Sequence, residues 1–230
     1  MKIVITAGGT SEPIDDVRKI TNTSTGSLGL AIGRAFLDGH RDRIDKIYYL
    51  HGEKAAYPED ELVEPITVGG TMDLMDKLEM ILETDRIDAV VHAMAVSDYM
   101  VDQVTTVEAI RTGVKSDAIS GNKISSTIDD LAIILKRTPK VIGIIKKISP
   151  QSKLVGFKLL SNVPHEELMD VASHLMEKND CDFVLANDLS EIGEGRHRGY
   201  LLHRDGTVDT METKQEIAEM IAKRITEEVL

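Results

Sequence analysis

Short runs of apolar residues recur along the chain, and each ends in glycines or in polar residues. The runs are KIVITAGG (2–9), DKIYYLHG (45–52), IDAVVHAMAVSDY (87–99), LAIILK (131–136), KLVGFKLL (153–160) and CDFVLANDLS (181–190). Short apolar runs rich in β-branched residues and bounded by turn signals are typical of buried strands. We therefore predict a strand in each run, with the run at 87–99 as a central parallel strand whose carboxyl end faces a site.

Between these runs, apolar residues recur every three or four positions. The segments with this period are 26–39, 71–84, 139–149, 164–180 and 214–230. Such spacing predicts helices with one apolar face. Thr71 is a candidate N-cap of the second helix, and Pro139 suits the first turn of the third. Strands that alternate with helices predict an α/β fold with a mostly parallel, Rossmann-like sheet, here as one domain over 1–230.

Two regions depart from this alternation. The pattern is weak and irregular over 101–126, and residues 199–210 suggest a hairpin with Asp205-Gly206 at its turn. We expect the two regions to pair into a small antiparallel extension, which is a candidate dimer contact.

Composition narrows the classes of function. The net charge of −12 disfavours nucleic acid and anionic membranes as partners. No apolar run approaches the roughly 20 residues that span a bilayer, and no signal peptide precedes the first strand. The single cysteine, Cys181, excludes an internal disulfide and fits a reducing compartment. We expect a cytoplasmic protein.

The charge is unevenly distributed. No acidic residue occurs from Leu131 to His165, where there are seven bases: Lys136, Arg137, Lys140, Lys146, Lys147, Lys153 and Lys158. This stretch is either a solvated basic face or a local anion site in an otherwise acidic chain.

The loop after the first strand has the composition of an anion-binding loop. Gly8 and Gly9 allow backbone amides to approach phosphate oxygens, and Ser24, Thr25 and Gly26 precede a helix whose N-terminus favours an anion. The spacings G-x-G-x-x-G and G-x-x-x-x-G-K-[ST] are both absent. The nucleotide signal is therefore weak, and a structural turn with a helix cap remains the alternative.

Four polar side chains are candidates for chemistry, although each also has an ordinary structural role. Arg18 and Asn22 lie in the loop insertion and suit an anionic substrate or a turn. Asp98 ends the central strand, where a carboxylate suits Mg²⁺, a substrate hydroxyl or a cap. Lys123 lies in a loop, where an ammonium suits a triphosphate or solvent. His92 lies in an apolar run and reads as a buried histidine.

Several motifs in order resemble one family. TAGGTSEPIDDVRKITNTSTGSLGLAI, AMAVSDY, NKISS, VGFKLL and VLANDLS resemble the motifs of phosphopantothenoylcysteine synthetase (phosphopantothenate–cysteine ligase), over residues 5 to about 190. The family has a Rossmann-type sheet that dimerises. In many bacteria it is fused behind a flavin-dependent decarboxylase domain, and this chain is too short to include one, so we expect no flavin.

The resemblance implies a reaction in two steps. The carboxylate of 4′-phosphopantothenate attacks the α-phosphate of a nucleoside triphosphate, and pyrophosphate leaves. The amine of cysteine then attacks the acyl-nucleotide, and the nucleoside monophosphate leaves. Bacterial members use CTP and eukaryotic members favour ATP, each with Mg²⁺, so we expect CTP here with an acyl-CMP intermediate.

The resemblance also implies roles for residues. Asn22 and Lys123 match catalytic positions beside the acyl-nucleotide and its phosphates; Arg18 and Ala95 match the phosphopantothenate site, and Asp98 matches the aspartate that serves substrate and metal. The nucleotide-binding positions implied are Gly8, Gly9, Ser24, Gly26, His92, Ala93, Met94, Asp98, Lys123, Pro139, Lys140, Val141, Ile142, Phe157 and Lys178.

The chain departs from the family pattern in two places. The lysine loop of the fused enzymes continues as K-x-K-K, whereas Ser125 and Ser126 follow here. Of two lysines expected before the AND motif, only Lys178 is matched, with a gap of one residue.

Two other functions stay open on this fold. An NAD(P)-dependent reductase would carry a Tyr-x-x-x-Lys pair, and none of the five tyrosines has a lysine four residues later. A non-catalytic nucleotide-binding protein would bind CTP without turnover.

Overall fold

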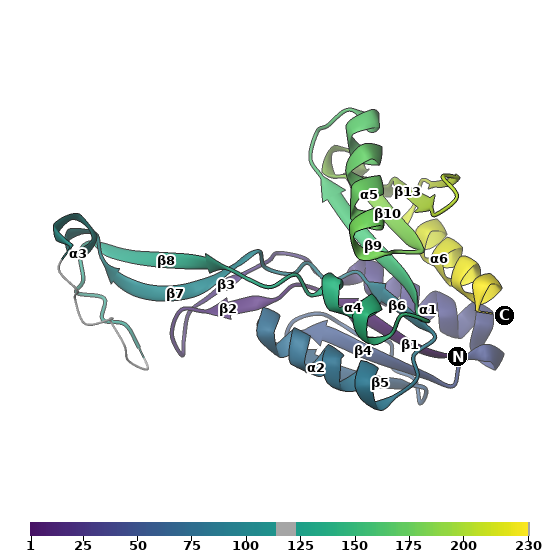
Figure 1. The fold of residues 1–230 in the computed structure, drawn as a ribbon, viewed down its shortest axis with the longest axis horizontal. Helices are drawn as coiled ribbons and strands as arrows, with labels where there is room; N and C mark the ends of the chain where they lie inside the picture. Colours follow the sequence, from purple (N-terminus) through teal and green to yellow (C-terminus); the bar gives the residue numbers. More distant parts are fainter. Residues whose placement is uncertain (114–122, 230) are drawn as a thin grey trace.

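An eight-stranded sheet forms the centre of the computed structural model, which describes residues 1–113 and 123–229 (Figure 1). The strands follow the order β14-β13-β10-β9-β6-β1-β4-β5. Their bounds are β1 Lys2–Ala7, β4 Lys46–Gly52, β5 Val63–Val68, β6 Ala89–His92, β9 Lys153–Leu160, β10 Phe183–Asp188, β13 Gly199–His203 and β14 Val208–Met211. The first six in chain order are mutually parallel, and β13 and β14 extend the sheet antiparallel.

Strand β1 lies where the direction of the sheet's growth reverses. The chain leaves β1 for β4 and β5 on one side, then crosses to β6 on the other side. Because loops diverge in opposite directions at such a point, a crevice opens there at the carboxyl ends of the strands. The predicted α/β class is confirmed, and the topology puts the loops after β1 and β6 side by side.

Helices cover both faces of the sheet. Helices α1 (Ser27–His40) and α6 (Lys214–Glu228) pack on one face with Ile5, Phe36 and Phe183. Helices α2 (Thr71–Thr84), α4 (Ile142–Ile148) and α5 (His165–Asn179) pack on the other face. The apolar face predicted for α2 is the one that is buried, and α4 begins three residues after Pro139. No described helix is long and apolar enough to cross a bilayer.

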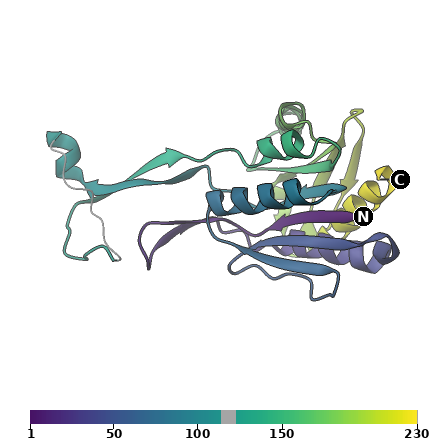
Figure 2. The same ribbon diagram turned by 60° about the horizontal axis from the view of Figure 1, so that its bottom comes forward.

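Two antiparallel ribbons leave the carboxyl edge of the sheet. We call β7 (Tyr99–Thr106), β8 (Leu131–Arg137) and α3 (Val107–Thr112) the arm, and β2 (Ser11–Pro13) with β3 (Lys19–Thr21) the ribbon. The arm projects far from the helices that cover the sheet, and the ribbon follows its base (Figures 1 and 2).

The structure corrects the pairing expected for the two irregular regions. We expected 101–126 to pair with the hairpin at 199–210. Instead β7 pairs with β8, while the hairpin β13–β14 joins the edge of the main sheet next to β10. The segment 131–136 is a strand as predicted, but it lies in the arm and not in the main sheet. Its apolar residues are partly exposed there rather than buried. Residues 114–122 of the weak region lie outside the described residues.

Smaller elements complete the chain. These are β11 Ile192–Gly193, β12 Arg196–His197 and the 3-10 turns Arg41–Arg43 and Leu189–Glu191. The chain ends lie at the edge of the sheet opposite the crevice. Met1 precedes β1 and binds Asp45, while Glu228 at the end of α6 pairs with Lys153 at the start of β9 (Figure 1).

Candidate functional site

Glycines allow the loop after β1 and the loop before α1 to pack closely at the carboxyl end of β1. Gly8 and Gly26 have φ of 84° and 75°, and a Cβ atom on Gly26 would lie 2.9 Å from the Gly8 nitrogen. A Cβ atom on Gly9 would lie 2.7 Å from the Asn22 carbonyl oxygen. The loop before α1 therefore packs against the backbone of the loop after β1, which no larger residue would permit.

Hydrogen bonds fix the Asn22 side chain against the loop after β6. Its Nδ2 donates to the Ala95 carbonyl oxygen at 2.9 Å, and its backbone N–H donates to Thr10 at 3.2 Å. Thr10 Oγ1 in turn accepts from the Ser97 N–H at 2.8 Å. Because both backbone and side chain are held, the Asn22 amide has one orientation at the point where β1 and β6 diverge.

A crevice of about 720 Å³ opens beside Asn22. We call it the strand-end crevice, and its walls come from 22–29, 93–98, 157–159 and the segment after β10. The N-terminus of α1 faces it without a capping side chain and without an acidic residue in its first turn. Among the described residues, only the Ser27 N–H has a side-chain acceptor there, Thr25 Oγ1 at 3.4 Å, so the positive end of the helix dipole favours an anionic group.

Six of the fifteen positions expected at the nucleotide line this crevice: Ser24, Gly26, Ala93, Met94, Asp98 and Phe157. Asn22 and Ala95, expected at the acyl-nucleotide and at phosphopantothenate, line it as well. The N–H groups of Ala93 and Met94 donate to Thr6, at its carbonyl oxygen (3.1 Å) and hydroxyl (3.2 Å). What Ala93 and Met94 present to the crevice is thus their carbonyl and side-chain surface.

His92 lies beneath the crevice rather than in it. Its Nδ1 lies 3.0 Å from Thr6 Oγ1, and burial lowers the pKa of the imidazole to about 4. A neutral histidine in contact with a hydroxyl is a satisfied core residue at physiological pH. The buried-histidine interpretation agrees with this placement, and His92 is absent from the described lining of the crevice.

The segment Pro139–Ile142 lies at the rim. Lys140 Nζ pairs with Asp98 Oδ1, and the Thr138 N–H donates to the Asp98 carbonyl at 3.0 Å. Val141 is buried, and Ile142 lies over Gly156. Lys178 is exposed in the last turn of α5, next to Asn179, whose side chain lies near Gly143. The end of α5 therefore adjoins the rim, but Lys178 does not line the crevice among the described residues.

The carboxylate oxygens of Asp98 can bind a metal ion that arrives with a substrate. Its carboxylate is 67% exposed and faces the crevice mouth. Within 1–113 and 123–229, no three His, Cys, Asp or Glu side chains gather as a protein metal site. A single exposed carboxylate fits Mg²⁺, which keeps waters and is commonly held by one or two carboxylates together with phosphates.

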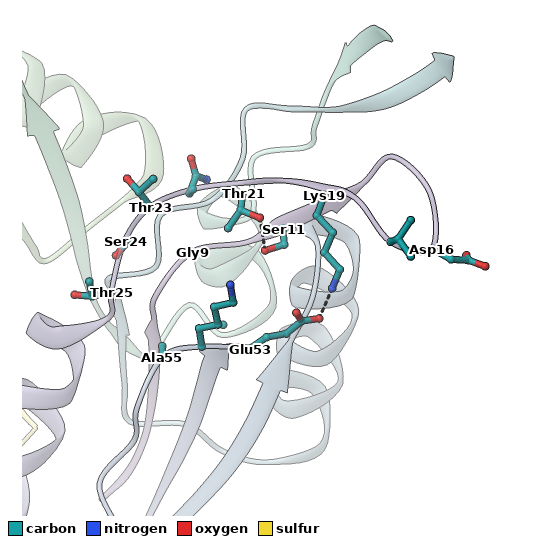
Figure 3. A pocket seen from close by; sticks show the side chains of 14 residues that line it. Gly9, Ser11, Asp16, Lys19, Thr21, Thr23, Ser24, Thr25, Glu53 and Ala55 are labelled. Atoms are coloured by element: carbon teal, nitrogen blue, oxygen red, sulfur yellow. Dashed lines mark hydrogen bonds and ion pairs between the residues drawn. The ribbon is translucent and has the colours of Figure 1, made fainter. Parts of the chain in front are cut away.

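A second cavity of about 660 Å³ lies on the other side of Asn22. We call it the ribbon cavity, since the ribbon and the turn after β4 form its walls; its lining includes Ser11, Asp16, Lys19, Thr21, Glu53 and Lys54 (Figure 3). Lys19 pairs with Glu53 across it. Residues 22–25 line both cavities, so Asn22 stands between two polar spaces.

Arg18 contacts the start of the lysine loop at the end of the ribbon. Arg18 Nη2 donates to the carbonyl oxygen of Ile124 at 2.7 Å, and Lys123 directly precedes Ile124. Arg18 is absent from the described lining of both cavities, and Lys123 is exposed. The ribbon therefore holds the residue next to Lys123, although the two segments lie more than 100 residues apart in sequence.

The basic stretch at 131–165 is largely engaged in ion pairs. Lys136 pairs with Asp102, and Lys146 and Lys153 both pair with Asp182. Of the seven bases in this stretch, only Lys158 lines the strand-end crevice. The stretch is therefore not one anion site, because its bases lie on three different elements.

Sequence reasoning assigned no site role to the wall formed by the ends of β9 and β10 and by the segment after β10. Lys158, Asn187, Leu189 and His197 line the crevice there. Asp188 accepts hydrogen bonds from Ser190 and from the backbone N–H groups of Asn162 and Val163, and these hold the pKa of its carboxyl well below the usual range. The signal available was the polar end of the run at 181–190, which repeats that of the central strand.

The sequence matches known proteins over nearly its whole length. The model of the DNA/pantothenate metabolism flavoprotein C-terminal domain matches residues 1–229. The coenzyme A biosynthesis bifunctional protein CoaBC of Thermococcus kodakarensis is 30% identical over 221 residues, which are 96% of this chain and 49% of that protein. The chain thus spans about half the length of the curated relatives it matches.

Solved structures give the same fold. The DNA/pantothenate metabolism flavoprotein from Streptococcus pneumoniae is 34% identical, covers 99% of both chains and has a TM-score of 0.87. A Cab2 mutant in complex with phosphopantothenate-cysteine is 17% identical and has a TM-score of 0.73, and the match covers 99% of this chain and 86% of that one, which shows a shared fold. This chain belongs to the family of DNA/pantothenate metabolism flavoprotein C-terminal domains.

Proposed function

We propose that the protein is a phosphopantothenate–cysteine ligase of coenzyme A biosynthesis. Family membership supports the reaction class, and the strand-end crevice supplies a place for it. The observation that carries the proposal is the Asn22 amide, held by Ala95 between an anion-favouring crevice and a second polar cavity. A ligase must bring an activated carboxylate and an amine to one point, and this amide lies at such a point.

The nucleotide occupies the strand-end crevice in this proposal. Its phosphates lie at the N-terminus of α1 near Ser24 and Gly26, and its base lies toward Phe157 and the rim at 139–142. Asp98 would hold Mg²⁺ that arrives on the triphosphate, and the ion would supply positive charge against the phosphates. CTP is the proposed nucleotide, with ATP as the alternative.

The chemistry then has two balanced steps. The carboxylate of phosphopantothenate attacks the α-phosphate, and the bond to the β,γ-pyrophosphate breaks. The amine of cysteine attacks the acyl carbon, loses a proton, and expels the nucleoside monophosphate. One N–H of the Asn22 amide stays on Ala95, and the other exchanges its long contact with Ser97 Oγ (3.4 Å) for the oxygen on which charge develops, which is the task of an oriented amide dipole.

The arm supports a homodimeric assembly. Its exposed apolar residues are Tyr99, Val107, Ile110, Ile133, Ile134 and Leu135. A two-stranded ribbon with one helical turn is marginal in water, so a second copy that covers this surface would stabilise it. Sedimentation of the protein and of Ile134→Asp tests this: a wild-type monomer at micromolar concentration would contradict it.

A turnover assay tests the proposed reaction. The purified protein is incubated with Mg²⁺, phosphopantothenate, cysteine and either CTP or ATP. We expect release of pyrophosphate and nucleoside monophosphate that depends on both other substrates, faster with CTP. Failure with both nucleotides would refute the proposal, and CTP binding without turnover would favour a non-catalytic nucleotide-binding protein.

Asn22→Asp tests the role of the amide. The carboxylate would face the Ala95 carbonyl oxygen, acceptor against acceptor, so the side chain would turn away. We expect slower breakdown of the acyl-nucleotide, which accumulates in single-turnover mass analysis, and little change in nucleotide affinity. Equal loss in both half-reactions would contradict this role.

A further inference from the structure

The loop at the end of the ribbon contains a buried carboxylate with no place in the chemistry above. The Asp15 side chain is 1% exposed, although it lies in a turn outside the sheet's two cores. Its Oδ1 accepts from the N–H groups of Val17 (3.0 Å) and Arg18 (2.8 Å), which closes the turn. Its Oδ2 is free of this task and points to another segment.

That segment is the start of the lysine loop. Asp15 Oδ2 accepts from the backbone N–H of Ile124 at 3.0 Å, and Arg18 Nη2 donates to the carbonyl of the same residue at 2.7 Å. The backbone N–H and the carbonyl oxygen of Ile124 are thus both held by the turn that contains Asp15 and Arg18. Asp15 and Ile124 lie 109 residues apart in sequence. The Ile124 side chain is 3% exposed. We call these two hydrogen bonds the latch.

The latch fixes two cations relative to one another. Lys123 directly precedes Ile124, and Arg18 forms half of the latch itself. Arg18 uses one N–H on Ile124, and its Nε lies 3.6 Å from Asp15 Oδ2, so the N–H groups of Nη1 stay available for an anion. A lysine alone in a loop has many positions, and the latch removes most of this freedom before a ligand arrives.

We propose that Asp15 is a positioning residue that, through Ile124, holds Lys123 and Arg18 together as one site for the anionic substrates. The effect on catalysis rests on the proposed ligase function, whereas the latch itself does not. The hydrogen bond from Ile124 is also the main reason that the pKa of the Asp15 carboxyl lies below its ordinary range, so the carboxylate is charged at neutral pH.

Asp15→Asn is the sharpest variant, because it removes the Asp15 hydrogen bond of the latch, together with the charge that pairs with Arg18, and spares the turn. The remaining Oδ1 still accepts from Val17 and Arg18, while the new Nδ2 meets the Ile124 N–H donor to donor. Asp129→Asn is the matched control. It makes the same change of charge in the lysine loop itself, at an exposed residue.

The first readout is limited trypsin cleavage of the bond between Lys123 and Ile124, identified by the mass of the new N-terminus. Cleavage requires the loop to open locally, and the latch opposes this. We expect Asp15→Asn to be cleaved roughly tenfold faster than wild type, the change that corresponds to one hydrogen bond to a charged group. Asp129→Asn should match wild type. Equal cleavage of wild type and Asp15→Asn would overturn the latch.

The second readout is steady-state kinetics. We expect Asp15→Asn to raise the KM for the nucleoside triphosphate roughly tenfold, with a smaller change in kcat. Faster cleavage with an unchanged KM and kcat would overturn the link to the substrates and leave a purely structural turn. If wild type shows no turnover, the proposed function fails, and the cleavage comparison still decides whether the latch exists.

Discussion

The sheet and the arm differ in how their apolar residues are covered. In the sheet, strands such as β9 and β10 bury aliphatic side chains between helices on both faces, and Leu154 and Val184 are fully buried. In the arm, α3 buries none of its residues, and β8 leaves Ile134 and Leu135 more than a third exposed. The sheet is therefore stabilised from within this chain, whereas the arm depends on what it contacts.

Truncating one leucine in each region tests this difference most strongly. Leu154→Ala in β9 should lower the free energy of unfolding by about 2–5 kcal/mol, because it leaves a cavity in a closed core. Leu135→Ala in β8 should cost under about 1 kcal/mol, because that side chain is 42% exposed. Urea unfolding of both variants measures the two costs, and similar losses would show that the arm shares the core's stability.

A pair of lysine variants tests the same difference between the sheet and the arm through their ion pairs. Lys146 pairs with Asp182 at 2.8 Å, with both side chains nearly buried, while Lys136 pairs with Asp102 at 2.9 Å in the exposed arm. Lys146→Met should lower the free energy of unfolding by about 3 kcal/mol, which is the lower end of the range for a broken buried ion pair. The loss is limited because Lys153 remains 3.5 Å from Asp182. Lys136→Met should cost about 0.5 kcal/mol or less. A large loss in Lys136→Met would contradict the view of the arm as solvent-exposed.

Acid should affect the sheet through His92. Burial lowers its pKa to about 4, below the unfolded value of about 6.5, so the unfolded chain binds the extra proton first. The contribution of neutral His92 to the free energy of unfolding is fully present above about pH 6.5. It falls as the pH drops toward 4, and about 2 kcal/mol is lost at pH 5. His92→Gln should flatten this slope in urea titrations at pH 7.5 and 5. The arm contains no histidine, so a slope that persists would point to other groups.

The sheet was predictable from the sequence because buried strands and one-sided helices leave periodic patterns. Strand β5 escaped notice, since Pro65 interrupts its pattern, and it is tolerated there because β5 is an edge strand. The ribbon escaped as well: a three-residue strand of exposed residues such as β3 has no hydrophobic signal.

The candidate site was predictable only in part, for a related reason. Asn22, Ala95 and Asp98 follow strands that lie side by side, so topology brings them together. Asp15 and Ile124 have no such guide, because their contact depends on how two long insertions fold over each other. Local patterns do not encode contacts between insertions.

The position of the chain ends has a practical consequence. Both ends lie at the edge of the sheet opposite the crevice, since β1 begins there and α6 ends there (Figure 1). A short flexible tether at either end would anchor the molecule to a sensor surface with the crevice, the ribbon and the arm directed into solution. Immobilised protein of this kind would let nucleotide binding and self-association be followed on the same surface, with neither process masked by the attachment.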